Sequence, residues 1–226
     1  GYYFGRELHQ QLQQKADGKQ NGGVIPIGLI SSNWGGTKAE VWTPLDRFKG
    51  VPEIEKLLTD YESYQAAYPE KVEQHKQQLA AWEKKPKEDR GRKPRAPRPI
   101  DHHGFPGTLY NAMIHPVAPF AIRGAIWYQG ESNARRAEQY KTLLPVMIDA
   151  WRDAFERPEM PFGIVQLANF RKPLDEPGKD DNWAELRWAQ YLTAKNDPNA
   201  GLAVAIDIGA ANDIHPKNKQ DVGKRL

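Results

Sequence analysis

AIWYQGESNA, residues 125–134, begins as a buried strand and changes abruptly to polar and small side chains, with a helical segment behind it. Open α/β sheets bind their ligands at the carboxyl ends of the strands. Gln129, Glu131, Ser132 and Asn133 can accept, donate and orient hydrogen bonds at such an edge. The stretch therefore predicts the rim of an active site, without indicating which side chain reacts.

Apolar runs of strand length alternate with helical segments along most of the chain. Residues 24–30 form a continuous apolar run, as expected for a parallel strand that is buried on both faces. Such alternation predicts an α/β fold, with a parallel sheet and helices on both of its faces. We expect helices at 2–16, 109–115, 137–155, 183–196 and from 217 onward, and strands at 24–30, 121–128, 162–167 and 202–208.

Residues 50–103 differ in character, and we predict that they are an insertion, a helical hairpin followed by a basic loop. Apolar side chains recur there at helical spacing, and Pro69 is expected to start the second helix of the hairpin. Residues 84–99 are rich in Lys, Arg and Pro and should form an exposed, extended loop. The main domain would then comprise residues 1–49 and 104–226.

The composition describes a folded chain and excludes several kinds of site. The 226 residues are 39% hydrophobic and include seven Trp, enough for one sizeable core. No Cys is present, so disulfides and thiolate metal sites are excluded. The net charge is +3, and the main basic segment is Pro-rich, which does not favour a nucleic-acid partner. No apolar run is long enough to span a membrane.

Two further polar loops follow expected strands. SSNWGGT, residues 31–37, ends the first apolar run, and the backbone N–H groups beside its two Gly can face a ligand. On the other loop, Asp213 precedes His215 by two residues, so its carboxylate can orient the imidazole as the acid of a hydrolase triad does. Asp101-His102-His103 has no second cluster at ligand spacing, and no metal is predicted.

Ordered segments of this chain resemble the conserved blocks of sialate O-acetylesterase-like proteins, within the SGNH hydrolase superfamily. They are residues 29–44 (second block), 109–116 (before the third block), 127–133 (third block), and 213–216 with Lys219 and Arg225-Leu226 (block of the catalytic His). Residues 4–8 match the helix before the Trp-Gly-Gly loop. The resemblance covers nearly everything except 50–103 and implies a flavodoxin-like, three-layer sandwich.

The resemblance implies a serine esterase that removes acetyl groups from sialic acid or from an acetylated polysaccharide, without a cofactor. The family's nucleophile lies in an upstream Gly-Gln-Ser-Asn block that this sequence lacks, so we expect the nucleophile outside this chain and no activity from the chain alone. His215 would be the base, and Asp213 or Glu131 its acid. Backbone N–H groups of Gly35 or Gly36, with the Gln129 side chain, would stabilise the oxyanion in a site to which Trp34 contributes a stacking surface.

Two alternatives stay open at this point. Residues 130–134 loosely resemble a nucleophile elbow with Ser132 as nucleophile, although the last small residue is Ala and the acid and base are only two residues apart. If Ser132 is not the nucleophile, we expect it to cap the following helix. The chain could instead be a non-catalytic carbohydrate-binding fragment. The resemblance suggests a periplasmic or secreted location, and the sequence indicates neither the sugar nor an oligomeric state.

Overall fold

The computed structural model describes residues 1–17, 24–174, 176 and 181–226. At its centre lies a sheet of three parallel strands, in the order β1 (Ala125–Trp127), β2 (Phe162–Val165) and β3 (Ala200–Ala203). Ile126 pairs with Gly163, and Gly163 pairs with Gly201. Because all strands run in the same direction, their carboxyl ends lie at one edge of the sheet. The α/β prediction is confirmed.

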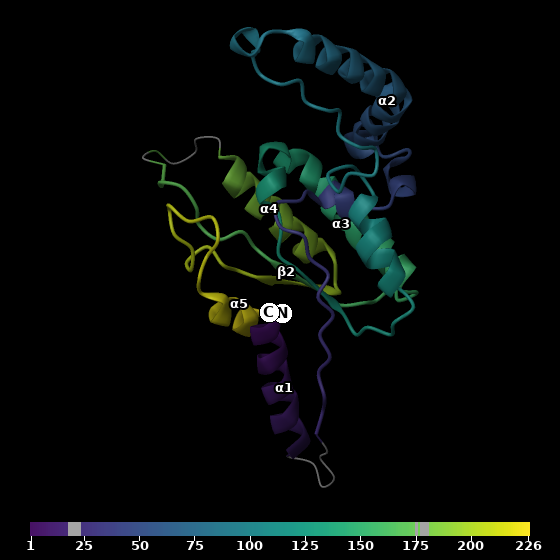
Figure 1. The fold of residues 1–226 in the computed structure, drawn as a ribbon. Helices are drawn as coiled ribbons and strands as arrows, with labels where there is room; N and C mark the ends of the chain where they lie inside the picture. Colours follow the sequence, from purple (N-terminus) through teal and green to yellow (C-terminus); the bar gives the residue numbers. More distant parts are fainter. Residues whose placement is uncertain (18–23, 175, 177–180) are drawn as a thin grey trace.

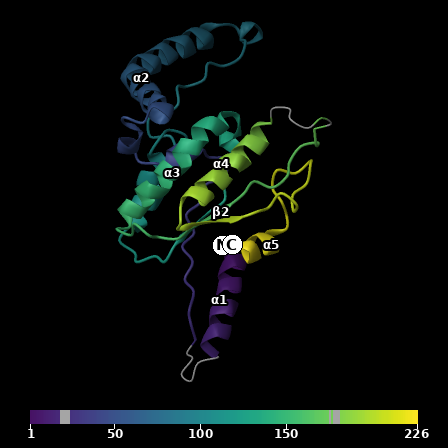
Figure 2. The same cartoon turned by 180° about the vertical axis from the view of Figure 1, so that it is seen from behind.

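Helices lie on both sides of the sheet, and the first helix of the chain extends away from it (Figures 1 and 2). On one face α3 (Ala137–Ala154) packs along α4 (Asn182–Asn196), and on the other α5 (Lys219–Arg225) packs against α1 (Tyr2–Asp17). A Cβ on Gly223 would come within 2.6 Å of the Phe4 backbone nitrogen, so only Gly allows α5 to approach α1 this closely. These helices confirm the four expected from helical periodicity, within two residues at each described end.

Short helical turns connect the main elements. They are η1 (Ala39–Trp42), η2 (Leu45–Phe48), η3 (Lys87–Asp89), η4 (Tyr110–Ile114), η5 (His115–Val117) and η6 (Glu131–Arg136). The first turn of the pair η4 and η5 is a π-turn and the second a 3-10 turn, and together they confirm the helical segment expected at 109–115. None of the described helices has the length and apolar character needed to cross a membrane.

The main core lies between the sheet and α3. Leu144, Met147 and Ile148 are fully buried because their spacing places them on one face of α3. Trp127, at the end of β1, packs edge-on against Trp42 and Trp151, with ring centroids 5.9 and 5.6 Å apart. Since Trp42 belongs to η1, this aromatic cluster anchors the segment that follows residues 31–37 to the first strand of the sheet.

The prediction of a strand at 24–30 is wrong. The segment is extended, but it pairs with no strand in the described part of the chain, and Val24 is 78% exposed. It lies along α1 instead, where His9 Nδ1 is 2.9 Å from the Ile25 carbonyl oxygen and the Ile25 N–H donates to Gln13 Oε1. An apolar run favours extended backbone, whereas a strand also requires a neighbour that satisfies its N–H and C=O groups.

The strands at the centre of the sheet are shorter than the apolar runs that predicted them. β1 begins at Ala125, four residues later than expected, and β3 ends at Ala203, within the run at 202–208. Past β3 the chain turns, and the Ile208 N–H donates to the Ala205 carbonyl. Val204 and Ile206 are each 44% exposed, so their apolar character does not report burial in the sheet.

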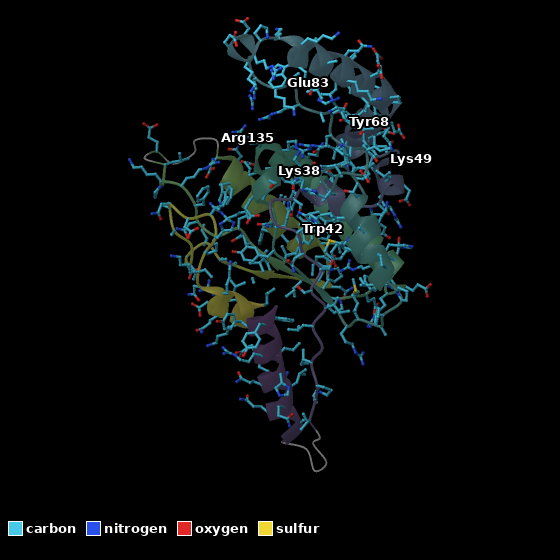
Figure 3. The ribbon with its side chains drawn as sticks, viewed as in Figure 1. Lys38, Trp42, Lys49, Tyr68, Glu83 and Arg135 are labelled. Atoms are coloured by element: carbon cyan, nitrogen blue, oxygen red, sulfur yellow. The ribbon has the colours of Figure 1, made fainter. Side chains whose placement is uncertain are left out.

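Residues 53–83 form one helix, so the predicted helical hairpin is wrong. α2 (Pro52–Lys84) contains 33 residues and continues through Pro69, which lacks an N–H and therefore removes only one hydrogen bond from a long helix. α2 is bent near Tyr68 (Figure 3). The partner that returns along α2 is the extended segment 85–100, called the strap below; α2 and the strap together are called the arm. That 50–103 is an insertion stays a prediction.

Candidate active site

Loops from different parts of the chain meet beyond the carboxyl ends of the strands. The Gly loop (residues 31–37) lies against the loop after β1, and the His loop (residues 207–216) lies against the loop after β2. Ser132 Oγ donates to the Gly36 carbonyl over 3.0 Å, the Gly209 N–H donates to Asn169 Oδ1 over 2.7 Å, and the Arg171 N–H donates to the Ala211 carbonyl over 2.8 Å. The sheet edge predicted as an active-site rim therefore does collect these loops.

Asn133 joins the Gly loop segment to the sheet. Its side-chain Oδ1 accepts the Ala39 N–H at 2.9 Å and the Gln129 Nε2–H at 2.7 Å, and its Nδ2 donates to Glu40 Oε2 at 3.0 Å. The side chain is 1% exposed, so these bonds are shielded from water. One amide thus bridges two chain segments that are more than 90 residues apart.

The buried carboxylate of Glu40 is held by both Asn133 and Arg136. Only 4% of the Glu40 side chain is exposed, and its second oxygen accepts from Arg136 Nη2 at 2.5 Å. Lys38 Nζ lies 3.9 Å from the same oxygen. A buried carboxylate requires such partners, because its desolvation costs several kcal/mol. The sequence interpretation missed this group, although a Glu between the apolar residues Ala39 and Val41 is the signal that could have identified it.

Gln129 is part of the same buried network. Its Nε2 donates to the Thr37 carbonyl at 3.1 Å as well as to Asn133, and its Oε1 accepts from the Tyr140 hydroxyl at 2.9 Å. The Tyr140 oxygen in turn accepts from Trp127 Nε1, and burial raises the pKa of Tyr140. Both ends of the Gln129 amide therefore bind protein groups, and this geometry does not present the amide to a reacting oxyanion.

The Gly loop presents free backbone donors. Gly36 has a φ of +73°, and a Cβ on Gly35 or Gly36 would meet nothing within 4 Å. Within the described residues, neither amide N–H donates to a protein acceptor. The expectation that Ser132 caps the following helix is wrong, because its hydroxyl holds the Gly36 carbonyl and leaves the neighbouring N–H groups directed elsewhere.

The candidate base is exposed on the His loop. The His215 side chain is 88% exposed, and its Nδ1 lies 3.9 Å from Asp213 Oδ1. That carboxylate oxygen accepts the backbone N–H of His215 at 2.9 Å, so Asp213 shapes the loop and stands beside the ring without a short bond to it. The structure places Asp213 beside His215, as the sequence predicted, but the two side chains are not in hydrogen-bond contact.

Glu131, the first residue of η6, lies near the His215 ring. Burial raises the pKa of Glu131, while backbone hydrogen bonds and the positive charges of His215 and Lys219 partly oppose this rise. Lys219 also lies over the Tyr128 ring at 4.7 Å, and burial raises the pKa of Tyr128 to about 12. Glu131 and Asp213 are therefore both close enough to affect His215, from different elements.

Trp34 is half-exposed at the Gly loop, with one face of its ring occupied. It stacks on His103 at 4.7 Å, and His103 stacks on His102 at 4.1 Å. Among the described residues no three His, Asp or Glu side chains gather as metal ligands. The His pair in this stack packs against the loop that we expect to meet the substrate, and Trp34 keeps 49% of its surface exposed.

Replacing Asn133 with Ala should destabilise the fold strongly. The substitution leaves the Ala39 N–H without its acceptor and removes one of the donors to the buried Glu40 carboxylate, which keeps Arg136, and we expect it to lower the free energy of unfolding by roughly 2–4 kcal/mol. Urea unfolding measures the change. Asn33→Ala is the matched control, because Asn33 is on the exposed Gly loop and its side chain bonds, within the described part of the chain, only to Ser31. Equal stabilities of the two variants would contradict this role of Asn133.

Glu131→Gln should show a pH-dependent gain in stability. Since the pKa of Glu131 is raised in the folded protein, folding favours the protonated form, and the ionised carboxylate destabilises the fold above that pKa. Thermal midpoints should therefore favour the variant near about pH 8, with the difference shrinking toward about pH 4 as wild-type Glu131 takes up a proton. The exposed Glu62→Gln is the control, and a gain that does not change with pH would refute the assignment.

Comparisons with known proteins agree on one family. The family model described as carbohydrate esterase, sialic acid-specific acetylesterase, matches residues 78–226. The chain is 31% identical to the sialate O-acetylesterases of Mus musculus and Homo sapiens, over 254 and 244 residues, which is all of this chain and 40% and 37% of those proteins. A carbohydrate acetylesterase from Xanthomonas citri has a similar structure, with a TM-score of 0.68 and 32% identity.

The matches cover all of this chain but less than half of each relative. The structural match covers all of this chain and 38% of the Xanthomonas citri chain. The 226 residues therefore span about two fifths of the curated relatives. The family model, by contrast, matches well over half of this chain and includes the Glu131 wall and the His loop. The chain belongs to the carbohydrate esterase family of sialic acid-specific acetylesterases.

Proposed function

We propose that this protein is a serine carbohydrate esterase that removes O-acetyl groups from a sugar, with its nucleophilic Ser in a segment outside these 226 residues. The observation that carries the proposal is the meeting of three features at one sheet edge: the unpaired N–H groups of the Gly loop, the exposed His215 and the partly buried Glu131. The names of the relatives, sialate O-acetylesterase and carbohydrate acetylesterase, indicate the acetyl ester and the sugar.

The proposed reaction proceeds in two steps at this edge. The Ser oxygen forms a bond to the acetyl carbon while His215 takes its proton, and the ester C–O bond then breaks as His215 returns the proton to the departing sugar hydroxyl. Water next hydrolyses the acetyl-enzyme to acetate. The negative oxygen that forms in each step would accept from the Gly35 or Gly36 N–H, and one such donor is typically worth about 3–4 kcal/mol.

The buried network argues for a supporting role of the loop after β1. Ser132 Oγ donates to the Gly36 carbonyl, away from His215, and this contact does not favour Ser132 as the nucleophile. Gln129 is bound at both ends of its amide, so we assign the oxyanion donors to the Gly loop backbone. Ser132 and Gln129 instead bind backbone carbonyls of the Gly loop and hold this loop at the edge of the sheet. There its N–H groups can donate to a carbonyl oxygen of the substrate.

Removing the candidate base should abolish deacetylation. In the full-length protein, His215→Ala should lower kcat/KM for 4-nitrophenyl acetate by at least about a thousandfold, because the variant loses the imidazole that is proposed to take the Ser proton. Glu62→Gln, at an exposed position on α2, is the control and should retain activity. We expect no His215-dependent turnover from the 226-residue chain alone. Robust turnover by that chain that is abolished in Ser132→Ala would overturn the assignment, and an inactive full-length protein would favour carbohydrate binding without catalysis.

Asp213 and Glu131 can be separated by their effect on the base. We expect Asp213→Asn to lower kcat by about a hundredfold or more with little change in KM, because Asp213 fixes the loop and the orientation of His215. Glu131→Gln should cost less, since Glu131 acts on His215 only through its charge. Steady-state kinetics across pH measures both. A larger loss in Glu131→Gln would make Glu131 the acid that orients His215.

A further inference from the structure

The strap carries most of the exposed positive charge of the arm. Between residues 84 and 98 there are eight basic side chains and only two acidic ones, Glu88 and Asp89. All the basic side chains except Arg90 are exposed. The eight are Lys84, Lys85, Lys87, Arg90, Arg92, Lys93, Arg95 and Arg98.

Side chains of α2 fix the backbone of the strap. Trp82 Nε1 donates to the Gly91 carbonyl at 2.8 Å, and the Tyr64 and Tyr61 hydroxyls donate to the carbonyls of Arg98 and Ile100 at 2.7 and 3.1 Å. These bonds, which recur along the helix, hold an otherwise extended Pro-rich segment in one position. A basic segment held in this way loses less conformational freedom when it binds a ligand.

Two of the basic side chains contact groups of this chain. Arg90 donates to the carbonyls of Glu83 and Lys85 at the carboxyl end of α2 and lies over the Trp82 ring. Arg98 lies over the Phe105 ring. The six others form no ion pair with a carboxylate in the part of the chain that the structure describes. Like charges that are crowded without counter-charges repel one another, and an anionic ligand relieves that repulsion.

A recess lies between the strap and α2 and has the chemistry of a site for an acidic sugar. Its volume is about 250 Å³, and Lys71, His75 and Arg95 surround it together with Tyr64 and two Gln side chains. Lys71 and Arg95 can bind a carboxylate, and the Gln78 amide can bind a hydroxyl group, whereas Gln74 already donates to Glu70. This set therefore suits one sugar unit that carries a negative charge.

The arm projects from the body above the Gly loop side of the molecule. Figure 3 shows Glu83, near the far end of α2, beyond Arg135 and Lys38. Lys38 directly follows the Gly loop and is 49% exposed, and Arg135 is exposed on η6. Positive side chains thus occur both on the arm and on the part of the body next to the site, which suits a polymer longer than one sugar.

We propose that the arm binds a carboxylate-bearing polysaccharide, so that acetyl groups on an acidic polymer are presented to the active site; this proposal rests on the function proposed above. The free cations of the strap bind carboxylates along the polymer, and the recess holds one acidic sugar unit. Such binding is electrostatic, and it weakens as salt is added. Nucleic acid is the competing polyanion, and the test below separates the two.

Binding of polygalacturonate to the full-length protein tests the proposal, in an arm variant with Lys85→Gln, Arg92→Gln, Lys93→Gln and Arg95→Gln. We expect its Kd to rise at least about tenfold, because four charges next to the polymer are lost. The control carries Lys15→Gln, Lys49→Gln, Lys195→Gln and Lys224→Gln, which removes the same charge elsewhere on the surface, and its Kd should change less than about twofold. Neutral dextran should not bind, and thermal midpoints check that both variants fold.

The outcomes distinguish this proposal from the esterase assignment. The arm variant should raise KM for acetylated polygalacturonate and leave kcat/KM for 4-nitrophenyl acetate unchanged. Equal binding by the arm and control variants overturns the proposal, as does tighter binding of a single-stranded DNA of equal charge than of polygalacturonate. If polygalacturonate binds through the arm while no acetyl ester is cleaved, the esterase function fails and the anionic binding site stands.

Discussion

A buried carboxylate determines the geometry of this site. Glu40 is almost completely shielded from water, and an ionised group in that position is tolerated only while Asn133 and Arg136 both bind it. Both partners come from η6, whereas Glu40 follows the Gly loop. The Gly loop therefore cannot move away from the sheet edge without exposing a charge that has lost its partners. The position of the candidate oxyanion donors is in this sense a consequence of one desolvated charge.

The same constraint assigns different roles to the two walls of the site. After β1, two polar side chains that the sequence suggested as reactive are hydrogen-bonded within the protein. Gln129 binds Thr37 and Tyr140, and Ser132 binds Gly36. On the His loop the opposite holds, because His215 is exposed and Asp213 bonds to its backbone. The side chains around β1 are held by internal hydrogen bonds, and the His loop carries the candidate base. Glu131 lies on η6 near His215, and burial raises its pKa.

Local periodicity predicted much of the fold, and contacts distant in sequence account for the rest. α3 was predicted almost to the residue, since its amphipathic spacing is a property of the segment itself. α4, which has little amphipathic character, was also predicted to within one residue. The prediction of a strand at 24–30 was wrong because a strand also needs a neighbouring strand. The prediction that Pro69 starts a second helix was wrong because α2 continues on both sides of it. The loops that meet at the sheet edge were predicted from the ends of apolar runs. Glu40 and Arg136 were missed, and Asn133 was named only as a polar residue of the rim, because the bonds that join them connect residues more than 90 positions apart.

Charge is used in two opposite ways in this chain, and the contrast argues for two separate roles. Glu40 is buried and paired, so salt in the solvent has little access to it, and we expect this edge of the sheet to keep its shape over a wide range of ionic strength. Six basic side chains between residues 84 and 95 are exposed and form no ion pair within the described residues, so salt can screen their interactions with a ligand. A structural role for the strap would favour paired charges, because crowded unpaired cations destabilise the fold that carries them. Their retention on a backbone held by Trp82, Tyr64 and Tyr61 is therefore better explained by a ligand that supplies the missing negative charge.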